Sequence, residues 1–205
     1  MPAIHEIFAS VQGEGSLSGR SAIFIRLSGC SLRCPYCDTR EAWVRKKEMG
    51  VAEVLAEVDR LSRENPVAMV VLTGGEPLEQ DLLELVVGLS EKKVFTAIET
   101  NGLHFQDIKV DWWTVSPKDM NAYQINEQLW PRLNELKLLV TADLKVETVL
   151  DLAGRLPANK PIFLQPCGFN DQAFRNTLDF FNHCNAISIP NLRLGLQLHR
   201  FYRIP

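Results

Sequence analysis

Residues 29–39 of this 205-residue chain read GCSLRCPYCDT, and they indicate the kind of site that the surrounding fold must hold. It places Cys30, Cys34 and Cys37 in a C-x3-C-x2-C spacing, next to Gly29 and Pro35. The chain has five cysteines and no visible export signal, so crowded cysteines indicate metal or redox chemistry and not a disulfide framework. The alternative is three buried cysteines that act as small apolar side chains, and the tight spacing argues against it.

The number of cysteines narrows the kind of metal site. A closed structural zinc site takes four protein ligands, and a 4Fe-4S iron–sulfur cluster usually takes four cysteines. This stretch offers three, although Cys167 or Cys184 could supply a fourth from far along the chain, so zinc stays open on the residues alone. With three ligands, one iron of a cluster keeps an open position where a small molecule can bind and react.

Bulk composition excludes several other classes of protein. The chain is 46% hydrophobic and 23% charged, with a formal net charge of −3, which gives no general attraction to nucleic acid or an anionic membrane. The strongest apolar run, VAMVVL at 67–72, has the length of a strand and not of a membrane span. We expect a cytoplasmic protein with no nucleic-acid or membrane partner.

The hydrophobic pattern predicts one α/β domain over residues 1–205, since no linker or repeat divides the chain. Apolar, β-branched runs alternate with amphipathic segments, which is typical of a parallel sheet covered by helices. The predicted strands are 4–10, 22–28, 67–73, 94–100, 112–116, 135–141, 161–166 and 192–199. The predicted helices are 51–65, 78–92, 144–156 and 171–184.

Small polar motifs follow several of these strands. The cysteine stretch follows 22–28, GGEP at 74–77 follows the next strand, and NG, PK and PCG follow later ones. The carboxyl ends of parallel strands in an α/β barrel open into one shared mouth, so these motifs should line a single cavity. Four helices are too few for a closed barrel. We therefore expect an incomplete TIM-like (β/α) barrel with about six strands and outer helices.

The cysteine spacing after one strand and GGEP after a later one resemble the signature of radical S-adenosylmethionine (radical SAM) enzymes. The resemblance implies that Cys30, Cys34 and Cys37 hold a 4Fe-4S cluster whose open iron binds S-adenosylmethionine. The reduced cluster of that family cleaves this cofactor to a 5′-deoxyadenosyl radical. Gly74, Gly75 and Glu76 would contact its amino end, because glycines allow close backbone approach and a carboxylate suits an ammonium group. GGEP alone could be no more than a tight turn.

Further stretches resemble one family of these enzymes, the 7-carboxy-7-deazaguanine synthases. They are EIFASVQGEG at 6–15, CDT at 37–39, SPK at 116–118 and LQLHRFYRIP at 196–205. The resemblance implies ring contraction of 6-carboxy-5,6,7,8-tetrahydropterin to 7-carboxy-7-deazaguanine with loss of ammonia, a step toward queuosine and related 7-deazapurines. It also implies dependence on Mg2+, a low-potential electron donor such as flavodoxin or ferredoxin, and a homodimer. No residue is identified as a catalytic acid or base.

A pterin substrate needs hydrogen-bond acceptors for its amino edge and a cation for its carboxylate. Gln12 and Glu14 offer the acceptors, although QGEG alone would suit a solvated turn. Arg26 offers the cation, on the strand face opposite Ile23, Ile25 and Leu27. The resemblance adds further substrate contacts at Val11, Gly13, Thr73, His199 and Pro205.

The last predicted strand, 192–199, alternates leucines with polar residues and would carry Gln197 and His199 on one face. A polar stripe facing solvent is the alternative. A carboxylate at Pro205 would lie close enough to accept a hydrogen bond from the pterin amino group.

The resemblance assigns the remaining site residues. Thr39 would bind Mg2+, a hard ion that takes few protein oxygens, although a hydroxyl bonded to its own turn is the alternative. Glu99 and Asn101 would reach the same cavity, Cys167 would line it and Cys184 would belong to the core. S-adenosylmethionine would contact Tyr36, Cys37, Asp38, Gly74, Gly75, Glu76, Ser116, Pro117, Lys118, Gln165, Pro166, Cys167 and Gly168.

Two rival interpretations remain on the sequence. Another small radical SAM enzyme, such as a glycyl-radical activase, would share the cysteines and GGEP but would not need QGEG or the HRFYRIP ending. An iron–sulfur electron carrier or a zinc-binding module would not need polar motifs at several strand ends.

Overall fold

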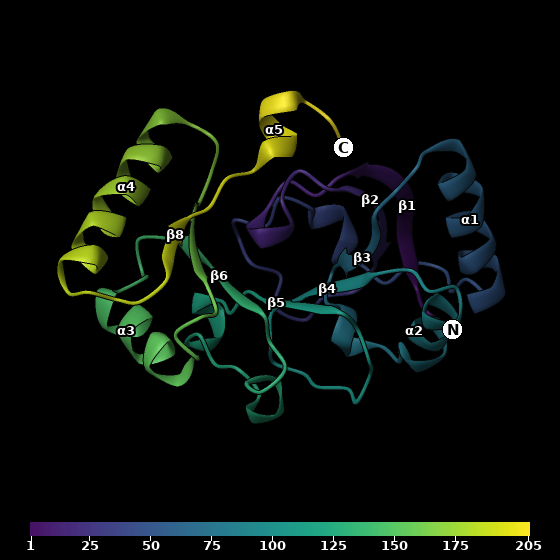
Figure 1. Cartoon of the computed structure of the whole chain (residues 1–205), viewed down its shortest axis with the longest axis horizontal. Helices are drawn as coiled ribbons and strands as arrows, with labels where there is room; N and C mark the ends of the chain where they lie inside the picture. The colour runs from purple at the N-terminus through teal and green to yellow at the C-terminus, as the bar shows by residue number, and fades with distance from the viewer.

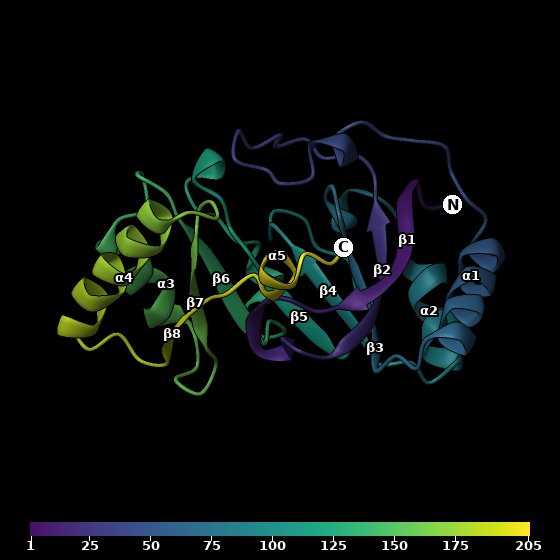
Figure 2. The ribbon, with the colours of Figure 1, turned by 90° about the horizontal axis from the view of Figure 1, so that it is seen from above.

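The computed structural model describes residues 1–205 and contains one eight-stranded sheet in which neighbours in sequence are neighbours in space (Figure 1). The sheet curves around a central space without closing into a barrel (Figure 2). Its strands are β1 (Ile4–Val11), β2 (Ser21–Leu27), β3 (Met69–Gly74), β4 (Thr96–Thr100), β5 (Trp112–Val115), β6 (Glu135–Val140), β7 (Ile162–Pro166) and β8 (Leu192–Leu194).

Strand direction explains how the site is assembled. β1 and β2 form an antiparallel hairpin, and every later pair, from β2 to β8, is parallel. The seven parallel strands therefore bring their carboxyl ends to one edge of the sheet. The prediction of an incomplete barrel is confirmed, although seven parallel strands form it where about six were expected.

Helices α1 to α4 lie outside the curved sheet (Figure 2). Helices α1 and α2 lie at the end near β1 to β4, and α3 and α4 lie at the end near β6 to β8 (Figure 1). No α-helix connects β4 to β5 or β5 to β6, and β1 and β8 are the unpaired edges of the sheet. The helices are α1 (Val51–Glu64), α2 (Leu83–Glu91), α3 (Val146–Arg155), α4 (Asp171–Ala186) and α5 (Leu198–Tyr202). None of them has the length and apolar character that crossing a membrane requires.

The main core is a cluster of 34 buried residues from the strands, helices and loops. β2 shows the two faces of the sheet clearly. Ile23, Ile25 and Leu27 are fully buried in this core, while Phe24 and Arg26 point into the central space, as the period of two predicts. The inner face is therefore free to carry chemistry.

Two predicted elements are wrong in part. Within predicted helix 78–92, a single 3-10 turn ends at Glu79, and α2 begins only at Leu83. The intervening Gln80 has a buried side chain that accepts from Ala3 N over 2.7 Å and donates to Ser28 O over 2.9 Å. These bonds join the loop after β3 to residues just before β1 and just after β2. The Asp81 side chain accepts a hydrogen bond from Leu83 N, where α2 begins.

Predicted strand 192–199 ends at Leu194, so Gln197 and His199 do not share a strand face. Gly195 N makes a last bond to Leu164 O of β7 over 2.7 Å, and the chain then leaves the sheet. Leu198 N donates to Gly13 O over 3.0 Å, which carries the C-terminal segment across to the β1–β2 hairpin. Figure 2 shows α5 and the C-terminus lying beside this hairpin, where they span the open side of the sheet.

Candidate active site

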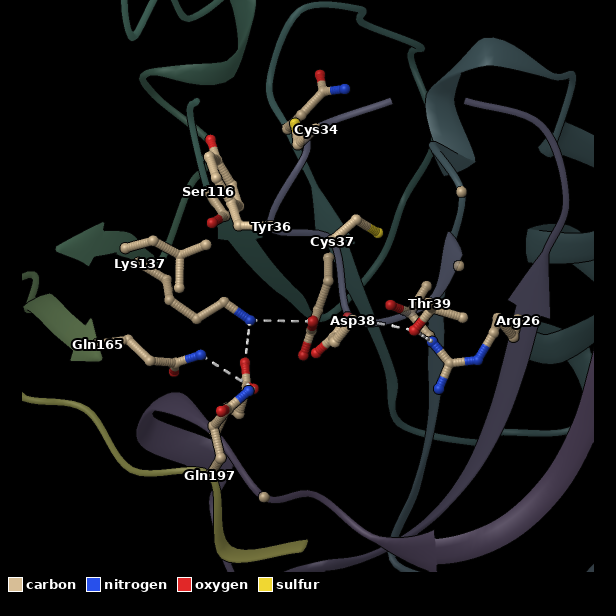
Figure 3. A pocket seen from close by; sticks show the side chains of 18 of the residues that line it. Arg26, Cys34, Tyr36, Cys37, Asp38, Thr39, Ser116, Lys137, Gln165 and Gln197 are labelled. Atoms are coloured by element: carbon tan, nitrogen blue, oxygen red, sulfur yellow. Dashed lines mark hydrogen bonds and ion pairs between the residues drawn. The ribbon is translucent and has the colours of Figure 1, made fainter. Parts of the chain in front are cut away.

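The carboxyl ends of the strands, the β1–β2 loop and the C-terminal segment enclose one cavity of about 730 Å³ (Figure 3). All the site residues proposed from the sequence line this cavity except Pro117. Pro117 is buried in the wall, between Ser116 and Lys118, which do face the cavity. Residues separated by almost the whole chain are thus brought together, as the strand-end motifs predict.

The three clustered cysteines lie on one loop after β2. The loop is held at its start by Gly29 N donating to Ala42 O over 2.7 Å, and it turns where Cys37 N donates to Cys34 O over 3.0 Å. All three thiols are free and face the cavity. Cys184 lies in the core on α4, with no exposed surface, and is not available as a further ligand.

The donor chemistry of this loop fits an iron–sulfur cluster, which binds to thiolates. Burial raises the pKa of Cys30 and of Cys34, so both are protonated thiols when no metal is bound. The three sulfurs do not converge on a common point in this structure, and no set of three His, Cys, Asp or Glu side chains has metal-ligand geometry. Cluster binding would therefore release protons and bring the three sulfurs together.

The GGE sequence after β3 packs directly against the start of the cysteine loop. Gly75 N donates to Leu27 O over 2.9 Å, and Glu76 N donates to Gly29 O over 2.7 Å. A Cβ on Gly75 would lie 2.0 Å from Gly29 O, and Gly74 has a φ of +125°. Only glycine allows this approach, so the two motifs form one unit.

The Glu76 carboxylate is almost fully buried and ties this unit to the end of β4. It accepts from the Thr100 hydroxyl over 2.5 Å, from Asn101 N over 2.7 Å and from Leu78 N over 3.1 Å. Burial raises its pKa despite these bonds. Most of its acceptor positions are therefore filled by the protein, and about one is left for a ligand.

Polar residues after β5 form the wall beside the cysteines. Lys118 Nζ donates to the Ser116 hydroxyl over 2.7 Å, and burial lowers the pKa of Lys118. The Tyr36 hydroxyl donates to Asp119, which links the cysteine loop to this wall. Burial and this bond raise the pKa of Tyr36.

The opposite end of the cavity holds a network of carboxylates and amides around Lys137 of β6 (Figure 3). Lys137 Nζ donates to Glu14 and, over 3.1 Å, to Glu99 Oε2. Gln165 and Gln197 donate to Glu14 Oε1 over 3.0 Å and 2.8 Å. Burial alone would raise the pKa of Glu14, but the attraction and hydrogen bond of Lys137 and the hydrogen bond from Gln197 lower it to about 2.

Arg26 and Thr39 lie on a third side (Figure 3). Arg26 Nη1 donates to the Thr39 hydroxyl over 3.3 Å, and its Nε donates to Glu6 over 2.8 Å. A cation and a hydroxyl thus lie together between the cysteine loop and the hairpin.

The C-terminal residues complete the enclosure. A Cβ on Gly13 would lie 2.3 Å from His199 Nδ1, so Gly13 makes room for the His199 ring. The Ser10 hydroxyl donates to Pro205 O over 2.6 Å, which anchors the segment's end on β1.

Lys137 is the main charged residue of this cavity that the motif analysis missed. Its signal was present, because Glu135 and Lys137 are the charged residues of the otherwise apolar β6 and lie two positions apart. A period of two places both on the inner face, where Glu135 accepts from the Thr114 hydroxyl and Ser16 N.

Comparison with known proteins agrees with this geometry. The family described as the Radical SAM superfamily matches residues 24–194, and the chain belongs to that superfamily. Membership implies a 4Fe-4S cluster and S-adenosylmethionine, for which the residues above provide suitable groups. Within the superfamily, the chain belongs to the family of the 7-carboxy-7-deazaguanine synthases, as its relatives show.

Two curated relatives carry the name 7-carboxy-7-deazaguanine synthase at 36% identity. The protein of Escherichia coli K12 aligns over 98% of both chains, and that of Bacteroides thetaiotaomicron aligns over 100% of this chain and 99% of its own. Among solved structures, QueE from Escherichia coli matches with a TM-score of 0.76 at 33% identity, over 96% of this chain and 93% of that one. Streptococcus suis SuiB, at 18% identity and a TM-score of 0.61 over 88% of this chain and 50% of that one, shares the fold.

Proposed function

We propose that this chain catalyses the ring contraction of 6-carboxy-5,6,7,8-tetrahydropterin to 7-carboxy-7-deazaguanine with loss of ammonia. The relatives named 7-carboxy-7-deazaguanine synthase support the assignment over nearly the full length. The single observation that carries it is the division of one cavity into a cysteine end and an end with pterin-binding chemistry. An electron carrier or a zinc module would have no use for the second end.

At the cysteine end, Cys30, Cys34 and Cys37 would hold the cluster, and Gly74 to Glu76 would approach the amino group of S-adenosylmethionine. Ser116, Lys118 and the segment 165–168 line the adjoining wall and would contact the rest of that cofactor. When bound together, the cluster and the cofactor supply the radical that removes hydrogen from substrate carbon. The protein positions the reactants and keeps water away from them.

At the other end, Gln12, Glu14 and His199 would bind the pterin ring, and Arg26 would pair with its carboxylate. Glu14 stays ionised at neutral pH because its pKa is held at about 2, so it accepts from ring N–H groups. Thr73 is paired with Arg26 in the β2–β3 register, so both lie on the same part of the cavity wall. Val11, Gly13 and Pro205 complete this end.

Thr39 would hold Mg2+ through its hydroxyl, and the ion would help to neutralise the substrate carboxylate that pairs with Arg26. Arg26 Nη1 lies 3.3 Å from the Thr39 hydroxyl, so a substrate carboxylate paired with Arg26 would lie near Thr39 and offer the oxygen ligands that Mg2+ prefers. Flavodoxin or ferredoxin as electron donor, and a homodimer, are proposed on the family resemblance.

The test is an anaerobic incubation of the reconstituted, reduced enzyme with S-adenosylmethionine, Mg2+ and the carboxylated tetrahydropterin. We expect 7-carboxy-7-deazaguanine, identified by mass and absorbance. Cofactor cleavage without deazapurine would point to another radical SAM activity, such as that of a glycyl-radical activase. No cofactor cleavage by an enzyme with a full cluster would remove the assignment to radical chemistry.

A further inference from the structure

We propose that Lys137 is a positioning residue that holds Glu14 and Glu99 as a fixed pair of acceptors for the amino-pyrimidinone edge of the substrate. This inference rests on the proposed function and extends it to residues that no motif identified. The three charged groups come from the β1–β2 loop, β4 and β6, so the fold assembles them from distant parts of the chain.

The triad is enclosed by the protein. The side chains of Lys137, Glu14 and Glu99 are 9%, 12% and 20% exposed. Two carboxylates that bond to the same ammonium repel each other in a buried site, and a buried charge without a partner is strongly unfavourable. Lys137, which bonds to both, relieves that repulsion.

The hydrogen bonds also set the orientation of each carboxylate. Gln165 and Gln197 fix Glu14 Oε1, while Gln12 Nε2 donates to Glu99 Oε1 over 2.8 Å. A carboxylate has about four acceptor positions, so about one remains on Glu14 and about two on Glu99. The 2-amino group and N3–H of a pterin offer three N–H donors, which match these free positions.

The charge state of the pair depends on Lys137. Burial raises carboxyl pKa values, and the Lys137 ammonium outweighs this effect at Glu14, whose pKa is about 2. The other charged groups nearby are Lys118 after β5, Glu76 after β3, Glu135 on β6, and His199 and Arg200 on α5; Arg200 donates to Gln197 Oε1 over 3.3 Å. None of them hydrogen-bonds to Glu14 or Glu99.

Removal of the ammonium should therefore let one carboxylate take up a proton at neutral pH. A protonated carboxyl group donates a hydrogen bond where the pterin needs an acceptor. Pterin affinity should then fall and should recover as the pH rises.

The experiment measures the dissociation constant of 6-carboxypterin, which carries the same amino-pyrimidinone edge but does not turn over. Binding is followed by pterin fluorescence on the reconstituted enzyme with S-adenosylmethionine and no reductant. For Lys137→Met we expect affinity about tenfold weaker than wild type at about pH 6, with the deficit shrinking toward about pH 9. Comparison with wild type at each pH cancels the pH dependence of the remaining groups, which both proteins share.

Two variants separate charge from packing. Lys137→Arg keeps the cation, so its affinity relative to wild type should not change with pH. Lys137→Met/Glu99→Gln removes the repulsion as well as the cation, so the added pH dependence should largely disappear. Circular dichroism and iron content serve as the controls for folding and cluster loading, because neither measures binding at this end of the cavity.

The outcomes are distinct. A Lys137→Met protein that binds 6-carboxypterin as wild type does at every pH overturns the positioning role, and so does an equal loss at every pH. If the wild-type enzyme does not bind the pterin, the result contradicts the proposed function itself, and with it the role of Lys137. Should Lys137→Met not fold, Glu99→Gln alone tests the acceptor pair, since it should weaken pterin binding about tenfold, and unchanged binding would overturn the inference.

Discussion

The Arg26 guanidinium donates to the Thr39 hydroxyl over 3.3 Å, although one lies within strand β2 and the other follows the cysteine loop. The pair places a permanent positive charge beside a hydroxyl oxygen that suits Mg2+, at the boundary between the two ends of the cavity. A substrate carboxylate placed there could be held by both. This relationship leads to the first two predictions.

Replacement of Arg26 by methionine should raise the KM for the carboxylated tetrahydropterin about 30-fold, because a charge-assisted bond to the carboxylate is lost. Arg26→Lys should recover part of the loss, since it keeps the charge but not the fork of donors. Steady-state kinetics measure both. A tetrahydropterin without the 6-carboxylate should bind wild type and Arg26→Met equally, and a clear difference there would contradict carboxylate pairing.

Replacement of Thr39 by alanine should raise the Mg2+ concentration for half-maximal activity about tenfold, because one oxygen donor is removed from a site with few protein ligands. Thr39→Ser keeps the hydroxyl and should stay close to wild type. Titration of activity with Mg2+ gives the comparison, with iron content as the control for the adjacent cysteine loop. Equal Mg2+ dependence in all three proteins would rule out Thr39 as a ligand.

Substitution by alanine distinguishes the cysteines that bind the cluster from those that do not. Cys34→Ala should lose most of the bound iron and the electron paramagnetic resonance signal of the reduced cluster, because a thiolate ligand is gone. Cys184→Ala, in the core of α4, should keep both. Cys167→Ala should also keep the cluster if three ligands suffice, and its loss in that variant would make Cys167 a fourth ligand.

The contact between the GGE turn and the cysteine loop predicts a large effect at Gly75. Gly75→Ala places a Cβ 2.0 Å from Gly29 O, so we expect destabilisation of about 3 kcal/mol and weaker S-adenosylmethionine binding. Gly154→Ala, on α3, is the matched control, because a Cβ there would meet no atom within 4 Å. It should raise the free energy of unfolding by about 0.5–1 kcal/mol. Denaturant unfolding measures both changes. Equal stability of the two variants would contradict the close packing described here.

Glu14 predicts a pH dependence of stability. Its folded pKa of about 2 lies below its ordinary value of 4.5, so its ionic contribution is complete above about pH 4.5 and is lost as the pH falls toward 2. At neutral pH, Glu14→Gln should reduce the free energy of unfolding by roughly 2 kcal/mol, and the difference from wild type should shrink below about pH 4.5. A difference that stays constant down to about pH 3 would show that Glu14 is not held ionised by Lys137.

Much of the site could be predicted because its chemistry is concentrated at strand ends. The positions of Cys30, Glu76 and Ser116 follow from one rule, that parallel strands end at one edge of a sheet. Arg26 could be assigned to the inner face because alternate residues of a strand face opposite ways.

The rest depended on tertiary contacts that local pattern does not contain. The strand predicted over 192–199 failed because Leu198 N bonds to Gly13 O, across the open side of the sheet. The helix predicted from residue 78 failed because the Gln80 side chain bonds to the N-terminal strand. Lys137 was missed because its partners, Glu14 and Glu99, lie 123 and 38 positions away.

The most direct measurement of the central claim follows a hydrogen atom between the two ends of the cavity. The substrate is labelled with deuterium at C6, the carbon that bears the carboxylate, and the 5′-deoxyadenosine formed during anaerobic turnover is examined by mass spectrometry. If the pterin end and the cysteine end hold their ligands side by side, deuterium appears in the 5′-deoxyadenosine and 7-carboxy-7-deazaguanine accumulates. Unlabelled 5′-deoxyadenosine formed without any deazapurine product would contradict the account.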